Sequence, residues 1–582
     1  MAHHDVVVIG AGFSGLYAAH KMRDQLGLTV QGFESAGGVG GTWWWNRYPG
    51  ARCDIESVHY SYTFSEELQR EWHWSERFAS QAEILAYLEW VADKLDVRRA
   101  FRFNTRVTSL TWDDAACHWL VRTDDGADCT ASFVVSCVGG LSAPKQPEFT
   151  GMDTFEGELY WTSRWPHQDV DFTGKRVAVI GTGSSGIQVI PEIAKQAAHL
   201  TVFQRTPNYA VPLNNSPVAA EQRRWNAEHH AELRAGSRRN SIGLPLENPK
   251  GPALDATPEE RRTTYDKYYD GNSLGLLAST YTDLLVNAEA NETLAAYVRQ
   301  RIRERVKDAA TAELLCPTDF PFATKRTPLE TNYFETFNLP HVELVDVRPA
   351  PIEALTPTGV RTSEAAYSFD AIVLATGFDS FTGPMTNIDI TGRDGATLKE
   401  KWSAHPATYL GFALAGFPNL FTVIGPQSAV GLYNTPLLIE DHVDLAAAAI
   451  STVRSEHARS LEPTPEAERA WVRLVEGIMD MTLFPRAKTS WYMGANIPGK
   501  PRGAYMFLGG GPLYLAVCRE VEQGGFAGFA LDGAARPVPS LLSLDAAEAL
   551  NLAGMLNFGM VSLEDKTVSD IEALVGELRS TR

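Results

Sequence analysis

The sequence predicts an α/β protein with two Rossmann-like dinucleotide-binding domains, one of which carries a helical insertion. A glycine motif of the form GxGxxG occupies residues 10–15, directly after an apolar run at residues 6–9. A second motif of this form occupies residues 181–186, directly after an apolar run at residues 177–180. Each arrangement is typical of a strand, a tight phosphate-binding turn and a helix. Between residues 213 and 322 the strand–helix alternation stops and charged, helix-favouring stretches appear, which predicts the insertion.

The first glycine motif opens a βαβ unit. A helix is expected from near Ser14, with Leu16, Ala19 and Met22 spaced to face the sheet. The following strand leads to Glu34, whose carboxylate can accept hydrogen bonds from ribose hydroxyls and would repel a 2′-phosphate. This unit is therefore expected to bind FAD or NAD.

The second glycine motif leads to a different residue at the corresponding place. Its strand at residues 200–203 is followed by Gln204-Arg205-Thr206, with no acid and with a guanidinium instead. A guanidinium suits bidentate capture of a 2′-phosphate. The second unit is therefore expected to bind NADP. Pro191 falls within its helix and is expected to remove one hydrogen bond there.

Strand patterns resume after the insertion, notably at residues 371–375 and 420–425. Both dinucleotide domains are therefore expected to be discontinuous. The predicted segments are 1–142 (FAD domain, first part), 143–212 (NADP domain, first part, with the linker), 213–322 (helical insertion), 323–378 (NADP domain, second part), 379–535 (FAD domain, second part) and 536–582 (C-terminal extension of unknown role).

Composition excludes several other classes of protein. The formal net charge of −19 argues against a nucleic-acid-binding surface. The six cysteines are scattered without zinc spacing, which indicates free thiols, and no metal site is expected. No apolar run approaches the length of a membrane span, and the first strand leaves no room for a signal peptide. We expect a cytoplasmic protein, a monomer or weak homo-oligomer, in which the doublet His229-His230 is solvated.

A glycine- and tryptophan-rich stretch runs from Gly40 to Asp54 and includes Trp43, Trp44 and Trp45. Glycines let the backbone approach a flat ring, aromatic side chains shield it from water, and Asp54 supplies a charge. Three tryptophans are more often part of a core than the wall of a cofactor site. The position directly after Glu34 nevertheless favours the cofactor wall.

Residues 155–166 read FEGELYWTSRWP, which resembles the FxGxxxHxxxWP signature of type I Baeyer–Villiger monooxygenases. The stretch at residues 40–54 is similar to that family's second motif. Thr324-Lys325-Arg326 and residues 490–500 resemble its phenylacetone and steroid monooxygenase branch. The resemblance extends to about Leu531, and the tail from Arg536 has no recognised counterpart.

This resemblance implies roles for individual residues. Arg326 would stand beside the flavin and stabilise an anionic peroxide, with Asp54 orienting its guanidinium. Lys325, Arg205 and Thr206 would hold the 2′-phosphate, and Trp491 would close over the nicotinamide ribose from a mobile loop. The catalytic residues are thus Arg326, Asp54 and Trp491. Together with these, the cofactor-binding residues implied are Gly10, Gly12, Ser14, Gly15, Glu34, Thr42, Trp43, Tyr60, Val107, Thr182, Gly183, Ser184, Ser185, Gly186, Gln188, Arg205, Thr206 and Lys325.

The activity implied is that of an FAD- and NADPH-dependent enzyme that inserts one oxygen atom from O2 next to a ketone carbonyl, through a C4a-peroxyflavin. The product is an ester or a lactone. The substrate pocket would include Ala429, Val430, Gly431, Leu432 and Tyr433. Small residues in this loop leave room and its larger ones reduce it, which favours a bulky or cyclic ketone.

One position departs from the family pattern. Trp161 occupies the place of the signature histidine, on the hinge between the two nucleotide domains. An indole cannot titrate or accept a hydrogen bond through nitrogen. We expect NADPH oxidation and oxygenation to be coupled differently in this chain.

Three alternatives use the same two-dinucleotide plan. A flavin monooxygenase that oxidises sulfur or nitrogen would lack the Lys325-Arg326 pair and the tryptophan-containing Gly-Lys loop at these places. A disulfide reductase needs a redox cysteine pair, whereas Cys53 stands alone. A redox-sensing dinucleotide-binding protein with impaired catalysis is supported only by Trp161.

Overall fold

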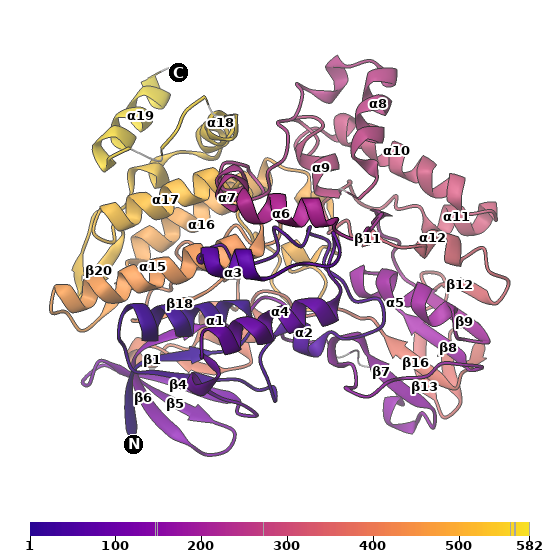
Figure 1. Cartoon of the computed structure of the whole chain (residues 1–582), viewed down its shortest axis with the longest axis horizontal. Helices are drawn as coiled ribbons and strands as arrows, with labels where there is room; N and C mark the ends of the chain where they lie inside the picture. Colours follow the sequence, from indigo (N-terminus) through magenta and orange to yellow (C-terminus); the bar gives the residue numbers. More distant parts are fainter. Residues whose placement is uncertain (146, 148, 272, 559, 564–565, 581–582) are drawn as a thin grey trace.

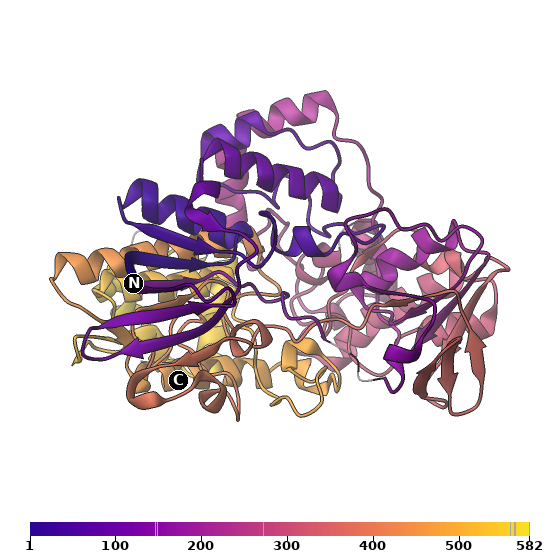
Figure 2. The ribbon, with the colours of Figure 1, turned by 90° about the horizontal axis from the view of Figure 1, so that it is seen from below.

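The structure, a computed structural model, describes all residues except 146, 148, 272, 559, 564–565 and 581–582. Figures 1 and 2 show two lobes side by side, each built around its own sheet, with both chain termini in the lobe on the left. Both glycine motifs lie between a parallel strand and a helix. The predicted α/β fold with two Rossmann-like units is therefore confirmed.

The first lobe contains an eight-stranded sheet in which β1 pairs in parallel with both β2 and β6. The strand order is β17-β4-β5-β6-β1-β2-β3, with β18 also pairing with β6. The strands are β1 (Ala2–Ile9), β2 (Val30–Phe33), β3 (Phe101–Arg102), β4 (Val107–Asp113), β5 (His118–Thr123), β6 (Asp128–Ser136), β17 (Asp389–Thr391) and β18 (Leu420–Thr422). Segments far apart in the chain thus share one sheet, because β17 and β18 return to it after the second lobe.

The turn between β1 and α1 (Phe13–His20) requires glycine at two positions. Gly10 has φ +102°, and a Cβ atom there would lie 2.5 Å from the carbonyl oxygen of Cys137. A Cβ atom on Gly15 would lie 1.7 Å from the carbonyl oxygen of Gly10. Leu16, Ala19 and Met22 are fully buried, as their spacing predicts.

The second lobe contains a five-stranded, all-parallel sheet in the order β12-β9-β8-β16-β7. Its strands are β7 (Glu158–Trp161), β8 (Arg176–Ile180), β9 (His199–Gln204), β12 (Val342–Asp346) and β16 (Ala371–Leu374). The second glycine motif joins β8 to α5 (Ser184–Ala194), which contains Pro191. The carboxyl ends of β9, β8 and β16 therefore lie next to one another at one edge of this sheet.

The predicted helical insertion is present and connects the lobes. It comprises α6 (Ala220–Glu228), α7 (His230–Arg238), α8 (Pro258–Tyr269), α9 (Ser273–Ala278), α10 (Ala288–Arg305) and α11 (Ala309–Leu315). Arg238 of α7 forms an ion pair with Asp441 of the first lobe. The prediction that His229-His230 is solvated is wrong for His230, which is 8% exposed because α7 lies against that lobe.

Three long helices and the C-terminal extension complete the first lobe. The helices are α15 (Thr435–Ser455), α16 (Pro465–Asp480) and α17 (Gly511–Gln523), and the extension forms α18 (Ala546–Asn557) and α19 (Val568–Ser580). Figure 1 shows the extension, in yellow, above α17. Leu552 and Ile571 of the extension are fully buried, and Glu520 of α17 accepts hydrogen bonds from the backbone N–H groups of Ser540 and Leu541.

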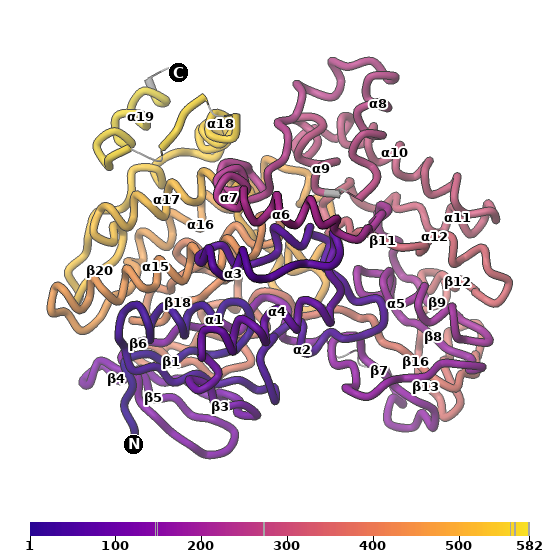
Figure 3. The backbone as a smooth tube through the Cα atoms, viewed as in Figure 1, coloured from indigo at the N-terminus to yellow at the C-terminus, as the bar shows by residue number. Residues whose placement is uncertain are grey.

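Shorter elements connect these parts, as the backbone trace in Figure 3 shows. They are α2 (Thr42–Trp45), α3 (Glu66–Glu71), α4 (Gln81–Lys94), β10 (Val211–Pro212), β11 (Leu329–Glu330), α12 (Tyr333–Thr336), β13 (Ile352–Thr356), β14 (Gly359–Thr362), β15 (Ala366–Ser368), α13 (Gly383–Thr386), α14 (Leu398–Lys401), β19 (Leu461–Pro463), β20 (Phe529–Leu531) and β21 (Ala534–Ala535).

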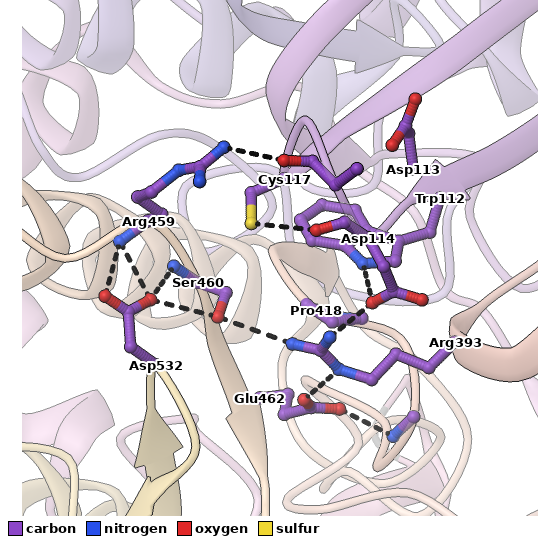
Figure 4. A network of polar contacts seen from close by, with 12 residues as sticks. Trp112, Asp113, Asp114, Cys117, Arg393, Pro418, Arg459, Ser460, Glu462 and Asp532 are labelled. Atoms are coloured by element: carbon purple, nitrogen blue, oxygen red, sulfur yellow. Dashed lines mark hydrogen bonds and ion pairs between the residues drawn. The ribbon is translucent and has the colours of Figure 1, made fainter.

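A polar network ties the β4–β5 turn to later segments of the first lobe (Figure 4). Arg393 forms ion pairs with Asp114 of this turn and with Glu462. Arg459 donates to the carbonyl oxygen of Ala116, and its backbone N–H donates to Asp532. These contacts join segments far apart in the sequence and lie away from the glycine motifs, so we assign them a structural role.

Two kinds of feature are absent from the described part of the chain. None of its helices is both long enough and apolar enough to cross a membrane. Its histidine, cysteine and carboxylate side chains nowhere gather as a group that could hold a metal ion.

Candidate active site

Two helix N-termini are free to receive phosphate groups. The N-cap residues of α1 and α5 are Gly12 and Gly183, and neither helix has a side-chain cap. A Cβ atom on Gly183 would meet no heavy atom within 4 Å, so a ligand can approach the backbone there. Unsatisfied N–H groups at a helix N-terminus favour an anion. Both turns therefore fit the pyrophosphate of a dinucleotide.

Glu34 follows the end of β2 and lies beside the first glycine turn. Its carboxylate accepts hydrogen bonds from the backbone N–H groups of Ala11 and Ala36, each at 2.7 Å. The side chain is 5% exposed. It therefore fixes the shape of the phosphate-binding turn, a contact that the sequence did not reveal. Oε1 also accepts from the hydroxyl of Ser35 at 3.2 Å, so Oε2 is the oxygen with a lone pair left for a ribose hydroxyl.

The predicted aromatic wall lies against the same turn. Trp43, on α2 next to Thr42, is buried and donates through Nε1 to the hydroxyl of Tyr60 at 3.3 Å. The two rings meet edge to face, with 5.8 Å between their centroids. A Cβ atom on Gly12 would lie 3.4 Å from the Cα of Gly41, so the tryptophan stretch touches the glycine motif. Val107 begins β4 and is buried.

Asp54 and Arg326 come from different lobes and form a bidentate ion pair. Arg326 donates from Nε to Asp54 Oδ2 at 2.8 Å and from Nη2 to Oδ1 at 2.6 Å. Its Nη1 donates to the carbonyl oxygen of Gly431 at 3.3 Å. The two charged side chains are only 19% and 20% exposed. The guanidinium is thus held in one orientation between three segments of the chain.

The electrostatics of this pair keep Arg326 charged. Burial alone would lower the pKa of Arg326, but the charge and hydrogen bonds of Asp54 raise it above its usual value. Burial also raises the pKa of Tyr492 to about 12, although the neighbouring Arg326 acts in the opposite direction. Tyr492 therefore stays a neutral hydroxyl, which donates to the carbonyl oxygen of Gly431 at 3.4 Å.

The segment that carries Trp491 is anchored beside Arg326. Ser490 donates from Oγ to the carbonyl oxygen of Thr324 at 2.7 Å, two residues before Arg326. The Trp491 ring stacks on Phe381, with 5.3 Å between centroids and 24° between planes. Trp491 thus lies within the same neighbourhood as the ion pair. Sequence reasoning missed Ser490 and Tyr492, although both flank Trp491 directly.

Positive charge gathers where the second unit was expected to hold a 2′-phosphate. Arg205 and Thr206 directly follow β9, and Thr182 donates from Oγ1 to the carbonyl oxygen of Thr206 at 3.0 Å. Burial lowers the pKa of Lys325 to about 8, and repulsion from Arg205 adds to this shift. The ammonium group of Lys325 lies 4.2 Å from the ring centroid of Phe320. An anion bound between these cations would relieve their repulsion.

Gln188 bridges the two lobes. Its Oε1 accepts from the hydroxyl of Tyr48 at 2.8 Å, and its Nε2 donates to the carbonyl oxygen of Arg52 at 3.0 Å. Ser184, Ser185 and Gly186 lie with it in the first turns of α5. The amide of Gln188 therefore couples the second glycine motif to the segment that ends at Asp54.

The predicted pocket loop is only partly directed at Arg326. Leu432 and Arg326 line a small cavity of about 10 Å³ together with Leu274, Leu277, Ala323, Lys325, Thr327 and Tyr492. Ala429 and Val430 are buried. Tyr433 instead fills a slot where a Cβ atom on Gly243 or Gly511 would come within 3 Å of its ring. Leu274 and Leu277 of this cavity come from α9 of the helical insertion.

Trp161 ends β7, where it lies in register with Leu374 of β16 and is half-buried. A few residues further on, Trp165 donates its backbone N–H to the carbonyl oxygen of Trp45 at 3.4 Å. The guanidinium of Arg164 lies 5.9 Å from the ring centroid of Trp45. The segment after Trp161 is therefore one of the places where the second lobe touches the tryptophan stretch of the first.

Comparisons with known proteins show which proteins share this sequence and fold. A family model described as flavin-binding monooxygenase-like matches residues 3–213. A solved structure of oxidised steroid monooxygenase bound to NADP has a TM-score of 0.87 and 47% identity, over 91% of this chain and 99% of that one. A Baeyer–Villiger monooxygenase of Pseudooceanicola batsensis is 40% identical over 548 residues, which cover 92% of this chain and 98% of the relative. Phenazine N-monooxygenase PhzNO1 of Lysobacter antibioticus is 39% identical over 531 residues, covering 91% and 97%.

The chain has two Rossmann-like units that meet at Arg326, and its relatives are flavin-binding monooxygenases. Together these findings define a flavin-dependent monooxygenase. Within that class, the chain belongs to the type I Baeyer–Villiger monooxygenases. The resemblance drawn from the motifs is therefore confirmed across nearly the whole chain.

Proposed function

We propose that this enzyme uses FAD and NADPH to insert one oxygen atom from O2 beside the carbonyl of a bulky or cyclic ketone, giving an ester or a lactone. The observation that carries the proposal is the bidentate Asp54–Arg326 pair at the meeting of the two lobes. Bound FAD, once reduced by NADPH, supplies the activation of O2, which side chains cannot perform. The chain supplies binding, orientation and electrostatics.

Arg326 is the proposed catalytic cation. A fixed guanidinium beside the reacting carbonyl stabilises the negative charge that develops on the ketone oxygen. Asp54 keeps the guanidinium charged and oriented, since it accepts from two of its three nitrogens. Leu274, Leu277 and Leu432 line part of the adjacent cavity with apolar surface, which would limit the access of water to this charge. Trp491 is proposed to close over the nicotinamide ribose.

Binding of the cofactors is proposed to follow the two glycine turns. FAD would use the first, with Gly10, Gly12, Ser14, Gly15, Glu34, Thr42, Trp43, Tyr60 and Val107. NADPH would use the second, with Thr182, Gly183, Ser184, Ser185, Gly186, Gln188, Arg205, Thr206 and Lys325. The domain limits given above are proposed for the same two units. Six unpaired thiols are compatible with a reducing cytoplasm, where we place the enzyme as a monomer or weak homo-oligomer.

The test is NADPH consumption across a panel of linear, aryl, cyclic and polycyclic ketones, with products identified by mass. A product heavier than its ketone by one oxygen atom, and cleaved by an esterase, supports the proposal. NADPH consumption that yields only hydrogen peroxide with every ketone contradicts it.

A second candidate is N-oxidation, favoured by the similarity to phenazine N-monooxygenase. A nitrogen heteroarene would receive the same oxygen atom without carbon migration. Phenazine therefore belongs in the panel, and an N-oxide formed faster than any ester would favour this second function.

A further inference from the structure

Lys145 is fixed at the carboxyl edge of the second sheet, although it belongs to the linker between the lobes. Its backbone N–H donates to the carbonyl oxygen of Gly377 at 2.9 Å, and its carbonyl oxygen accepts from Thr376 Oγ1 at 3.2 Å. Thr376 and Gly377 follow the end of β16, which pairs with β8. Lys145 is therefore placed beside the glycine turn after β8, at the same edge of the sheet as the segment after β9 that carries Arg205 and one strand away from it.

Lys145 is one of three cations near this edge of the second sheet. Lys145, Arg205 and Lys325 form no ion pair with any carboxylate in the described part of the chain. Burial lowers the pKa of Lys145, and repulsion from the nearby Arg205 lowers it further. The chain as a whole carries a formal charge of −19. Three cations without an ion pair in so acidic a protein, of which Lys145 and Lys325 are partly desolvated, indicate a site for a multiply charged anion.

Lys145 also contacts the segment that follows Trp491. Its Nζ donates to the carbonyl oxygen of Asn496 at 3.0 Å. The side chain of Asn496 donates to the carbonyl oxygen of Phe378 at 2.9 Å, and Lys500 forms an ion pair with Asp379. Residues 496–500 are thus seated on the end of β16 through Lys145 and its neighbours.

We propose that Lys145 is a third ligand of the NADPH 2′-phosphate, beside Arg205 and Lys325, and that its bond to Asn496 holds the Trp491 segment over the bound nucleotide. The inference rests on the proposed use of NADPH. An ammonium group has three donors, so Lys145 can serve the phosphate and the Asn496 carbonyl together. Binding of the 2′-phosphate would then favour NADP+ over NAD+ and would also hold the Trp491 segment over the bound nucleotide.

The test measures binding rather than turnover. NADP+ and NAD+ are titrated by calorimetry into the FAD-loaded enzyme and into its Lys145→Met, Lys145→Arg and Lys488→Met variants. Lys488 is an exposed lysine close to Trp491 in sequence, so its replacement changes the net charge equally. Lys145→Met is expected to weaken NADP+ binding by about tenfold or more, since a charge-assisted hydrogen bond is lost. NAD+ binding, the Lys145→Arg variant and the Lys488→Met variant should change by less than about twofold.

Hydrogen exchange of residues 494–500 gives the second readout. NADP+ is expected to slow exchange there in the wild type, and Lys145→Met should abolish this protection. Equal weakening of NADP+ and NAD+ would assign Lys145 a merely structural role and overturn the inference. Unchanged NADP+ affinity in Lys145→Met would do the same. If the wild type itself does not prefer NADP+ over NAD+, the proposed use of NADPH fails, and the role of Lys145 fails with it.

Discussion

Asp54 and Arg326 are 272 positions apart in the chain, yet two hydrogen bonds of 2.8 and 2.6 Å join them at the meeting of the lobes. Asp54 ends the tryptophan stretch of the first lobe, whereas Arg326 follows the helical insertion of the second. Their pairing therefore depends on the relative position of the lobes. The packing of the lobes therefore sets the position and orientation of the Arg326 guanidinium.

Arg326→Ala should separate reduction from oxygenation. We expect NADPH to reduce the flavin at near wild-type rate, because the nicotinamide site does not need this cation. Ester formation should fall by at least about a hundredfold, the effect of removing one group that stabilises developing charge. Stopped-flow absorbance and product analysis measure the two steps. Ester formation at a near-normal rate would refute the assigned role.

Asp54→Asn should leave the Arg326 guanidinium charged but less firmly held in its orientation. The amide can accept from one guanidinium nitrogen but offers no negative charge, so a charge-assisted pair becomes a weaker neutral contact. We expect kcat for ester formation to fall about tenfold. The KM for the ketone should change little. A large rise in KM with unchanged kcat would assign Asp54 to substrate binding instead.

NADP+ binding should depend on pH through Lys325. Burial, with repulsion from Arg205, lowers the pKa of Lys325 to about 8, although Asp319 opposes the shift. Lys325 carries its charge below this value and loses it as pH rises above 8. The affinity for NADP+ should therefore fall above pH 8, whereas that for NAD+ should stay level. Lys325→Arg should remove the dependence, and its persistence there would point to another group.

Trp161→His tests the departure from the signature motif. The half-buried indole ends β7 just before the segment that contacts Trp45. A histidine there would restore a hydrogen-bonding and titratable group at the hinge. We expect the hydrogen peroxide released per NADPH to change in the variant. An unchanged ratio would show that Trp161 couples the lobes as well as histidine does.

Leu552→Ala tests whether the C-terminal extension belongs to the first lobe. Leu552 is fully buried among α16, α17 and α18 residues of one apolar cluster. Truncation of a buried leucine costs about 2–5 kcal/mol. The midpoint of thermal unfolding of the FAD-loaded enzyme should fall by several degrees, whereas the exposed-site control Asn551→Ala should leave it unchanged. Unfolding at the wild-type midpoint would mean that the extension is not part of this cooperative unit.

Local patterns were sufficient for most of the fold. Gly10 and Gly15 signalled their turn because no side chain fits there, and Leu16, Ala19 and Met22 signalled a buried helix face by their spacing. His230 was misjudged, because its burial comes from a helix packing against the other lobe. The slot for Tyr433 between Gly243 and Gly511 was also unseen, since no short-range pattern connects these residues.

The sequence by itself determined the two nucleotide turns, the acid and the arginine that distinguish them, and the motifs of the family, because each depends on neighbours within one strand–turn–helix unit. Only the tertiary structure decided which atoms Arg326 contacts, that Gln188 spans both lobes, and that Lys145 reaches Asn496. These contacts join segments that meet only after the lobes have packed. Their geometry is set by the packing of whole elements, which no local spacing records.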